Sequence, residues 1–268
     1  MTAGMILFRE SDMDKRLAFN SVVNEYEKWR PDYVPEIFTK IMAYSKINED
    51  SHVLEVGIGT GKATAPFIET NCRITAIELG DKLADFSRRK FAWYDNLEIL
   101  VADFETHSFP DDTYDLIYAA CAFHWIPEEI GYPKAFKLLK NGGAFARFAN
   151  WQQRDKGNEL LNQEIQNVYS KYMPNSVPKP DYTETECKQR ADIALKYRFV
   201  DTQYRMFSRN RIFDADDFLS LQRTHGGHAD MPEEQWIQFA NDLKKAINSN
   251  GGKINIHDVM ELQLARKP

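Results

Sequence analysis

A glycine-rich turn directly after a short apolar strand is the feature that most constrains the fold of this chain. Residues 53–56 read Val-Leu-Glu-Val, and Gly57, Gly59 and Gly61 follow. Because glycine lacks Cβ, it can adopt φ > 0 and lets a ligand lie against the main chain. A helix expected at residues 62–69 would point its free N–H groups at the same place. The segment therefore predicts a cradle for a nucleotide cofactor.

The spacing of these glycines does not fit the dinucleotide fingerprint. That fingerprint is Gly-x-Gly-x-x-Gly and needs a glycine at position 62, where this chain has Lys62. An acid, Glu55, stands two residues before the first glycine. Its carboxylate could hold the ammonium end of an amino-acid-like ligand through bound water or the backbone. A nicotinamide-dependent oxidoreductase is therefore disfavoured.

Two further apolar runs end in acidic residues. Residues 73–78 form a β-branched run of strand type that ends in Glu78, seventeen residues after the last glycine of the turn. A carboxylate there suits the two hydroxyls of a ribose, as in dinucleotide folds. Residues 97–105 contain another strand, followed by Asp103 and Phe104. Both runs predict polar groups at the edge of the sheet where the strands end.

Residues 109–126 carry a fourth strand that runs into Phe-His-Trp, with His124 and Trp125 at its end. Together the four stretches resemble the motifs of the class I S-adenosylmethionine-dependent methyltransferases. Residues 26–33, with Arg-Pro-x-Tyr, and the closing residues 251–266 are similar to the trans-aconitate-methyltransferase-like, type 11 group. The likeness covers most of the chain. It implies S-adenosylmethionine as the methyl donor and S-adenosylhomocysteine as the product.

The likeness also implies a set of site residues. The residues expected at the donor are Tyr26, Arg30, Glu55, Gly57, Gly59, Gly61, Glu78, Leu79, Asp103, Phe104 and Ala119. In the family the Asp-Phe pair receives adenine. The residues expected on the acceptor side are Trp29, Tyr33, Trp125 and Arg147. Aromatic rings can face a sulfonium by cation–π attraction, although rings at such spacing are also typical of an ordinary core.

Strand and helix patterns alternate through the first half of the chain, which is typical of a doubly wound parallel sheet in an α/β protein. The expected strands lie near residues 52–56, 73–78, 97–101, 114–119, 143–149, 198–211 and 253–265. The likeness implies a seven-stranded, mostly parallel, Rossmann-like sheet whose last two strands form an antiparallel hairpin. We expect a single domain over residues 1–268. Its parts are a helical lid (15–47), a cofactor-binding core (51–150), an acceptor-side helical insertion (155–195) and closing strands and helices (198–268).

Composition and charge exclude several classes of function. The net charge of −6 and the pI near 5.6 argue against a nucleic-acid or anionic-membrane surface. Three scattered cysteines are too few for a disulfide framework or a zinc site, and the His225-Gly-Gly-His228 stretch lacks further ligands nearby. No metal is therefore expected. No run approaches the ~18 apolar residues of a membrane span, so we expect a soluble, cytoplasmic protein of undetermined oligomeric state.

The expected function is methyl transfer to a small-molecule acceptor. The likeness to trans-aconitate methyltransferases makes a carboxylate the hypothesis for that acceptor. A carboxylate attacks as it stands, whereas an alcohol, phenol or ammonium must first lose a proton. His124 is the candidate base or orienting donor, and the alternative is a half-buried histidine that caps a strand end. The other functions that stay open are a protein or tRNA methyltransferase and a catalytically silent, cofactor-binding domain.

Overall fold

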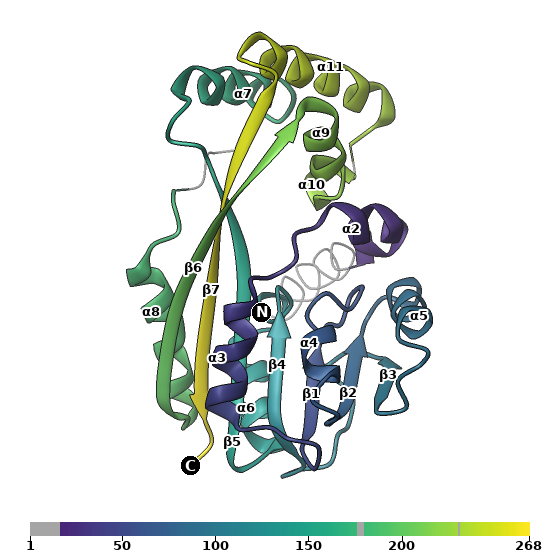
Figure 1. Cartoon of the computed structure of the whole chain (residues 1–268), viewed down its shortest axis with the longest axis vertical. Coiled ribbons are helices and arrows are strands. Elements are labelled where there is room, and N and C mark those ends of the chain that lie inside the picture. The colour runs from purple at the N-terminus through teal and green to yellow at the C-terminus, as the bar shows by residue number, and fades with distance from the viewer. Residues whose placement is uncertain (1–16, 176–179, 230) are drawn as a thin grey trace, which may run out of the picture.

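The chain folds around one seven-stranded sheet (Figure 1). The computed structural model describes residues 17–175, 180–229 and 231–268. The strands are β1 (His52–Val56), β2 (Arg73–Glu78), β3 (Leu97–Val101), β4 (Tyr114–Ala120), β5 (Leu139–Gln153), β6 (Val200–Asp214) and β7 (Lys253–Arg266). Their order is β3-β2-β1-β4-β5-β7-β6. The first five strands are parallel, and β7 is antiparallel to both of its neighbours. The predicted Rossmann-like sheet is therefore confirmed.

Helices cover both faces and one end of this sheet. The described helices are α2 (Val23–Trp29), α3 (Pro35–Ser45), α4 (Ala65–Ile68), α5 (Asp81–Lys90), α6 (Glu128–Leu138), α7 (Glu159–Tyr172), α8 (Glu184–Asp192), α9 (Ala215–Arg223), α10 (Gly226–Ala229) and α11 (Glu233–Ser249). Short 3-10 turns are η1 (Ala18–Ser21), η2 (Phe123–Trp125) and η3 (Ile193–Tyr197). The predicted lid is broken as expected, between α2 and α3. Residues 15 and 16 of that lid lie outside the described part of the chain.

The central strands are apolar on both faces because two separate cores flank them. Val53 of β1 and Leu116 of β4 point into a core that α3 covers. Their neighbours Leu54 and Ile117 point the other way, into a core that α6 covers. This alternation fixes which residues at the strand ends face which side of the sheet.

The last three strands are much longer than the first four and run beyond them (Figure 1). On this extension α7, α9 and α11 form a helical cap with its own apolar cluster, which includes Leu161, Phe218 and Phe239. The predicted insertion therefore divides into two parts, because α7 joins the cap whereas α8 packs along β6 and β7. The lid helix α2 lies between the cap and the carboxyl ends of the short strands (Figure 1).

One sequence expectation about the helices differs from the structure. The helix expected at residues 62–69 contracts to the four residues of α4, because residues 60–64 form turns. The free N–H groups of a long helix therefore do not contribute at the glycine turn. The β6 and β7 strands pair antiparallel as expected, with α9, α10 and α11 between them in the sequence. In the described residues no helix has the length and apolar character needed to cross a membrane.

Candidate functional site

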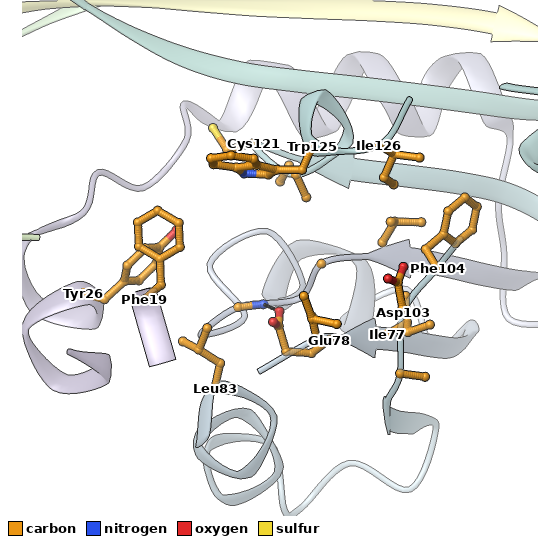
Figure 2. A pocket seen from close by; sticks show the side chains of 17 residues that line it. Phe19, Tyr26, Ile77, Glu78, Leu83, Asp103, Phe104, Cys121, Trp125 and Ile126 are labelled. Atoms are coloured by element: carbon orange, nitrogen blue, oxygen red, sulfur yellow. Dashed lines mark hydrogen bonds between the residues drawn. The ribbon is translucent and has the colours of Figure 1, made fainter. Parts of the chain in front are cut away.

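A first cavity opens at the carboxyl ends of β1, β2, β3 and β4, where ligands bind in open α/β sheets (Figure 2). Each strand end contributes a pair of residues to its wall. These residues are Gly57 and Gly59 after β1, Glu78 and Leu79 at the end of β2, Asp103 and Phe104 after β3, and Ala120 and Cys121 at the end of β4. The four motifs singled out in the sequence therefore converge on one cavity.

The glycine turn has the backbone geometry that its sequence predicts. Gly57 has a φ of 78° and Gly59 a φ of 57°, values that favour glycine. The Gly57 N–H donates to the Ile77 carbonyl at 2.8 Å, so the turn is tied to β2. A Cβ atom at position 57 would lie 2.5 Å from Cβ of Ala122, whereas a Cβ atom at position 59 would meet only open space. A ligand can thus approach the main chain at Gly59.

Gly61, the third glycine, has a packing role in the turn. Its φ is 74°, and a Cβ atom there would run into the ring of Phe91. The residue is buried and lines neither of the cavities described here. The expected donor contact of Gly61 is therefore corrected to close packing of the turn against the end of α5.

Glu78 is fixed by the backbone on both of its oxygens. One carboxylate oxygen accepts from the Gly59 N–H at 2.8 Å, and the other accepts from the Gly80 N–H at 2.9 Å. Burial raises the pKa of this carboxyl, and the bonds from Gly80 and Gly59 oppose that shift. Each carboxylate oxygen can accept more than one hydrogen bond. Glu78 lines the cavity, so its remaining lone pairs suit the two hydroxyls of a ribose.

The other end of the first cavity is lined by apolar side chains, and we call it the slot (Figure 2). Phe104 is buried at its wall, and Ile77 and Ile126 lie close by. One oxygen of Asp103 accepts from the Glu105 N–H at 2.8 Å, which orients the carboxylate at the rim of the slot. An apolar slot with a carboxylate at its edge suits a purine that carries an exocyclic amine. The residues present therefore fit an adenosine group along this cavity.

The lid closes the remaining side of the first cavity (Figure 2). Phe19 and Tyr26 line it, and burial raises the pKa of the Tyr26 phenol to about 12. The side-chain oxygen of Asn20 accepts from two N–H groups in the first turn of α5, which anchors the lid to the core. Arg30 donates to the Thr224 carbonyl at 2.8 Å, which joins the lid to the cap.

A second cavity adjoins the first and lies between the sheet edge, the lid and the cap. The two cavities share wall residues that include Gly57, Gly59, Cys121 and Trp125. The second cavity continues along β5 at Asn150, Trp151 and Gln152, and reaches Arg190 of α8 and His225 beyond α9. A group bound in the first cavity therefore meets a group bound in the second at the shared wall.

The described lining of the second cavity is positively charged. It includes Arg30, Lys62 and Arg190 but no Asp or Glu. Lys62 is paired with the exposed Asp32 at 2.9 Å. Nε of Arg30 and Nε1 of Trp151 are buried donors without a hydrogen-bond partner among the described residues. Because an unmade buried hydrogen bond costs about 1–3 kcal/mol, these donors favour a ligand that supplies acceptor atoms.

His124, the candidate base or orienting group, and Tyr33, a candidate acceptor-side residue, also line the second cavity. His124 is exposed on the η2 turn, and its ring packs against Trp125. Tyr33 packs edge-on against Phe148, with ring centroids 4.8 Å apart. Trp125 contributes to both cavities. These positions bring His124, Tyr33 and Trp125 together at the end of β4.

His225 is a residue of the second cavity that sequence reasoning missed. Its Nδ1 lies 3.1 Å from the Leu221 carbonyl. A carbonyl only accepts, so Nδ1 carries the hydrogen and Nε2 keeps its lone pair. Burial lowers the pKa of His225 to about 3, and the Arg30 charge adds to this shift, so the ring stays neutral. No local motif marks this residue, because only the packing of the cap brings it to the site.

His228, the second histidine of the same stretch, packs in the cap beside Phe239, with ring centroids 5.2 Å apart. It is buried and lines neither cavity. Across the part of the chain that the structure describes, no three His, Cys, Asp or Glu side chains are grouped so that they could hold a metal ion.

Two expected donor contacts need correction. Glu55 is fully buried, lines neither cavity and accepts from the Thr64 hydroxyl at 2.7 Å. It supports the turn from inside the core instead of reaching a ligand. Ala119 points into the core that α6 covers, and the next residue, Ala120, lines both cavities. This one-residue difference follows from the alternation of side chains along a strand.

Two expected acceptor-side contacts also need correction. Arg147 is buried on the α6 side of the sheet, where it donates to the Tyr132 hydroxyl at 2.9 Å. Its guanidinium carbon lies 5.6 Å from the centroid of the Phe123 ring. Trp29 packs against the apolar cluster of the cap. Neither residue lines a cavity described here, so both have structural positions.

The buried position of Glu55 predicts a pH-dependent effect of Glu55→Gln on stability. Burial raises the pKa of Glu55 from 4.5 to about 7, against the opposing hydrogen bond from Thr64. Since the folded state holds this proton more tightly than the unfolded chain, the contribution of Glu55 to stability is lost as the pH rises through this range. At ~1.4 kcal/mol per pKa unit, ionisation of Glu55 costs about 3 kcal/mol above this range.

We expect Glu55→Gln to gain stability over the wild type at about pH 8 and to show little gain at about pH 4. Glutamine keeps an oxygen for the Thr64 hydroxyl and carries no charge. Urea unfolding of both proteins at the two pH values measures the free energies of unfolding. A difference between the two proteins that is the same at both pH values would contradict the buried, proton-holding role of Glu55.

Comparison with known proteins connects this geometry to a catalytic family. Residues 53–143 match the family described as methyltransferase domain. An uncharacterized methyltransferase of Schizosaccharomyces pombe is 26% identical over 223 residues, which cover 80% of this chain and 86% of that protein. A candidate type II methyltransferase of Anaeromyxobacter dehalogenans superposes with a TM-score of 0.60 at 17% identity, over 88% of this chain and 97% of that one.

A larger solved structure has the same fold around a bound cofactor product. It is phosphoethanolamine N-methyltransferase 2 of Haemonchus contortus in complex with phosphomonomethylethanolamine and S-adenosylhomocysteine. The TM-score is 0.54 at 12% identity, and the match covers 93% of this chain and 57% of that chain. At this identity the likeness concerns the fold alone.

Proposed function

We propose, on the premise that this chain is a class I S-adenosylmethionine-dependent methyltransferase, that its methyl acceptor is a small anionic molecule with a carboxylate as the nucleophile. The donor supplies an activated methyl group on a sulfonium sulfur. Glu78 suits its ribose, the slot at Asp103 and Phe104 suits its adenine, and Gly57 and Gly59 let it lie against the main chain.

The charge of the second cavity is the observation that carries this proposal. Three cationic side chains and no acidic one line it, in a protein whose net charge is −6. Lys62 pairs with Asp32 and Glu27, and Arg190 lies 3.5 Å from Glu261, so these charges are partly balanced behind the lining. The cavity itself presents cationic donors and no acidic acceptor, and a carboxylate finds charge-assisted donors there. The lid, the cap and α8 surround the cavity, which favours a small molecule over a protein or tRNA acceptor.

The shared wall of the two cavities aligns the reacting atoms. Methyl transfer is an in-line displacement, and the main contribution of the protein is alignment, which can supply several kcal/mol. A donor bound in the first cavity would supply an activated methyl group at this wall, and a carboxylate held in the second cavity would present its oxygen to that group. The carboxylate needs no base. His124 then orients the acceptor at the end of β4.

Replacing His124 by alanine is expected to lower turnover severalfold and to leave donor affinity within about twofold. The reason is that His124 lines the second cavity and is absent from the lining of the first. Steady-state kinetics with the accepted carboxylate and calorimetric titration with S-adenosylhomocysteine give the two quantities. Intact turnover with every accepted substrate would assign His124 a structural role at the strand end.

The test of the proposed function is an acceptor screen in matched series. Formation of S-adenosylhomocysteine is measured with di- and tricarboxylates, such as succinate, glutarate and trans-aconitate, beside the corresponding amides, amines, phenols and alcohols. We expect turnover with carboxylates, and methyl esters as the products by mass spectrometry. Turnover confined to amines or phenols would overturn the carboxylate assignment and leave the donor assignment intact.

A further inference from the structure

Arg190 of α8 rests on a platform of two stacked aromatic rings at the edge of the second cavity. Its guanidinium carbon lies 4.9 Å from the Trp151 ring centroid and 5.4 Å from that of Tyr182. The two rings are nearly parallel, with an interplanar angle of 5° and centroids 4.9 Å apart. The contact of Arg190 with Trp151 joins α8 to β5, and the two rings restrict the position of the guanidinium group.

The carboxylate nearest Arg190 belongs to Glu261, and it accepts its hydrogen bonds from other residues. Glu261 is buried and accepts from the Tyr182 hydroxyl and from Nε2 of Gln263 on one oxygen. Its other oxygen lies 3.5 Å from Arg190, which is the long end of an ion pair. A guanidinium has five N–H donors, and the Arg190 side chain is 33% exposed. Most of these donors are therefore available to a ligand in the cavity.

Trp151 adds a second donor beside Arg190. Its indole nitrogen is buried without a hydrogen-bond partner among the described residues, and an indole N–H can only donate. Trp151 and Arg190 both line the second cavity, and no described Asp or Glu does. A cation and an unpaired N–H donor in one wall suit an oxyanion, which supplies several acceptor atoms and a negative charge.

Arg190 and Trp151 lie away from the place where the two cavities meet. Arg190 and Trp151 line the second cavity only, whereas the wall shared with the first cavity includes Gly59, Cys121 and Trp125. In the proposed function, the methyl group passes from the first cavity to the second at this shared wall. We propose that Arg190 and Trp151 form a recognition subsite for a second anionic group of the acceptor, which is not the group that is methylated. This inference rests on the function proposed above and assigns the acceptor to the dicarboxylates or higher.

The subsite is tested by binding to the full-length protein saturated with S-adenosylhomocysteine. Succinate, glutarate and trans-aconitate are titrated calorimetrically, each dicarboxylate beside its monoamide. The wild type is expected to bind the dianions about tenfold or more tightly than the monoamides. Arg190→Gln should lose that preference, Arg190→Lys should keep part of it, and Trp151→Phe should weaken dianion binding while the aromatic platform remains.

Lys188→Gln is the matched control, because it removes one positive charge from the same helix. Lys188 is exposed, pairs with Asp192 at 2.7 Å and lines neither cavity. We expect the control to bind dianions within about twofold of the wild type. In turnover of an accepted dicarboxylate, Arg190→Gln should raise KM about tenfold and leave kcat within a few fold, since the anion that it holds does not react.

Three results would overturn the subsite, and they differ in what else they remove. Equal dianion binding by the wild type and a folded Arg190→Gln variant would remove the subsite and leave the proposed function standing. If the wild type turns over no carboxylate and binds none of the panel, the proposed function fails together with the subsite. Parallel affinity losses in Arg190→Gln and Lys188→Gln would assign the effect to general charge and also overturn the subsite.

Discussion

Glu78→Ala is expected to weaken binding of S-adenosylmethionine by about tenfold or more while the protein stays folded. Hydrogen bonds to a charged group contribute about 1.5–3 kcal/mol each, and Glu78 is positioned to offer two of them to the ribose hydroxyls. In the wild type, the Gly59 and Gly80 N–H groups donate to the Glu78 carboxylate at 2.8 and 2.9 Å, and the substitution removes both hydrogen bonds. Loss of these two hydrogen bonds also makes the glycine turn that faces the donor less ordered.

Calorimetric titration with S-adenosylmethionine, S-adenosylhomocysteine and NAD, together with a thermal melt, separates donor binding from folding. Glu36→Ala is the control, because Glu36 is an exposed carboxylate on α3 that lines neither cavity. The control should bind the donor like the wild type. If folded Glu78→Ala keeps wild-type affinity, the ribose does not lie at Glu78, and the assumed placement of the donor along the cavity is wrong.

Gly57→Ala is expected to have the second large effect, and it acts through shape instead of charge. The residue has a φ of 78°, and an added Cβ would lie 2.5 Å from Cβ of Ala122. The left-handed conformation alone costs about 1–2 kcal/mol for a residue with Cβ. The contact must additionally push apart the glycine turn and the segment after β4, which both line the first cavity. We expect donor affinity to fall by about tenfold or more and the melting temperature to decrease.

Gly142→Ala provides the matched control for backbone strain. Gly142 has a φ of 79°, nearly that of Gly57, but a Cβ atom there would meet nothing within 4 Å. It lies near the start of β5, whereas the residues of β5 that line the second cavity, such as Asn150 and Trp151, lie near the end of that strand. The control should lose a similar amount of stability to strain but keep its donor affinity. Equal donor affinities in the two variants would show that the close approach at Ala122 does not shape the cavity.

The lining of the first cavity could be predicted from the sequence because its parts are short and contiguous. Gly57 and Gly59 act through the main chain, and their conformations follow from the absence of Cβ. Glu78, Asp103 and Phe104 follow directly after apolar runs, and parallel strands bring all of their carboxyl ends to one edge. The structure places all five of these residues on the lining of the first cavity.

The sequence did not show which residues line the cavities where this depends on a one-residue shift along a strand or on burial of a side chain in the core. Ala119 and Ala120 are chemically identical, and only the pairing of β4 shows which of them faces the cavities. Glu55 and Arg147 are charged residues near the predicted site, yet both are buried. Glu55 accepts a hydrogen bond from Thr64, and Arg147 donates one to Tyr132. A sequence gives the charge of such a residue but not the partner that satisfies it inside the core.

The sequence by itself determined the sheet and the glycine turn, because these depend on local backbone preferences and on residues at strand ends. S-adenosylmethionine as the donor followed from the resemblance of these motifs to those of class I methyltransferases. Only the tertiary structure decided the acceptor side. Arg30, Trp151, Arg190 and His225 come from the lid, β5, α8 and the cap, and they meet in one cavity. Their proximity arises from long-range packing of the extended strands and the cap, which no short-range pattern in the chain records.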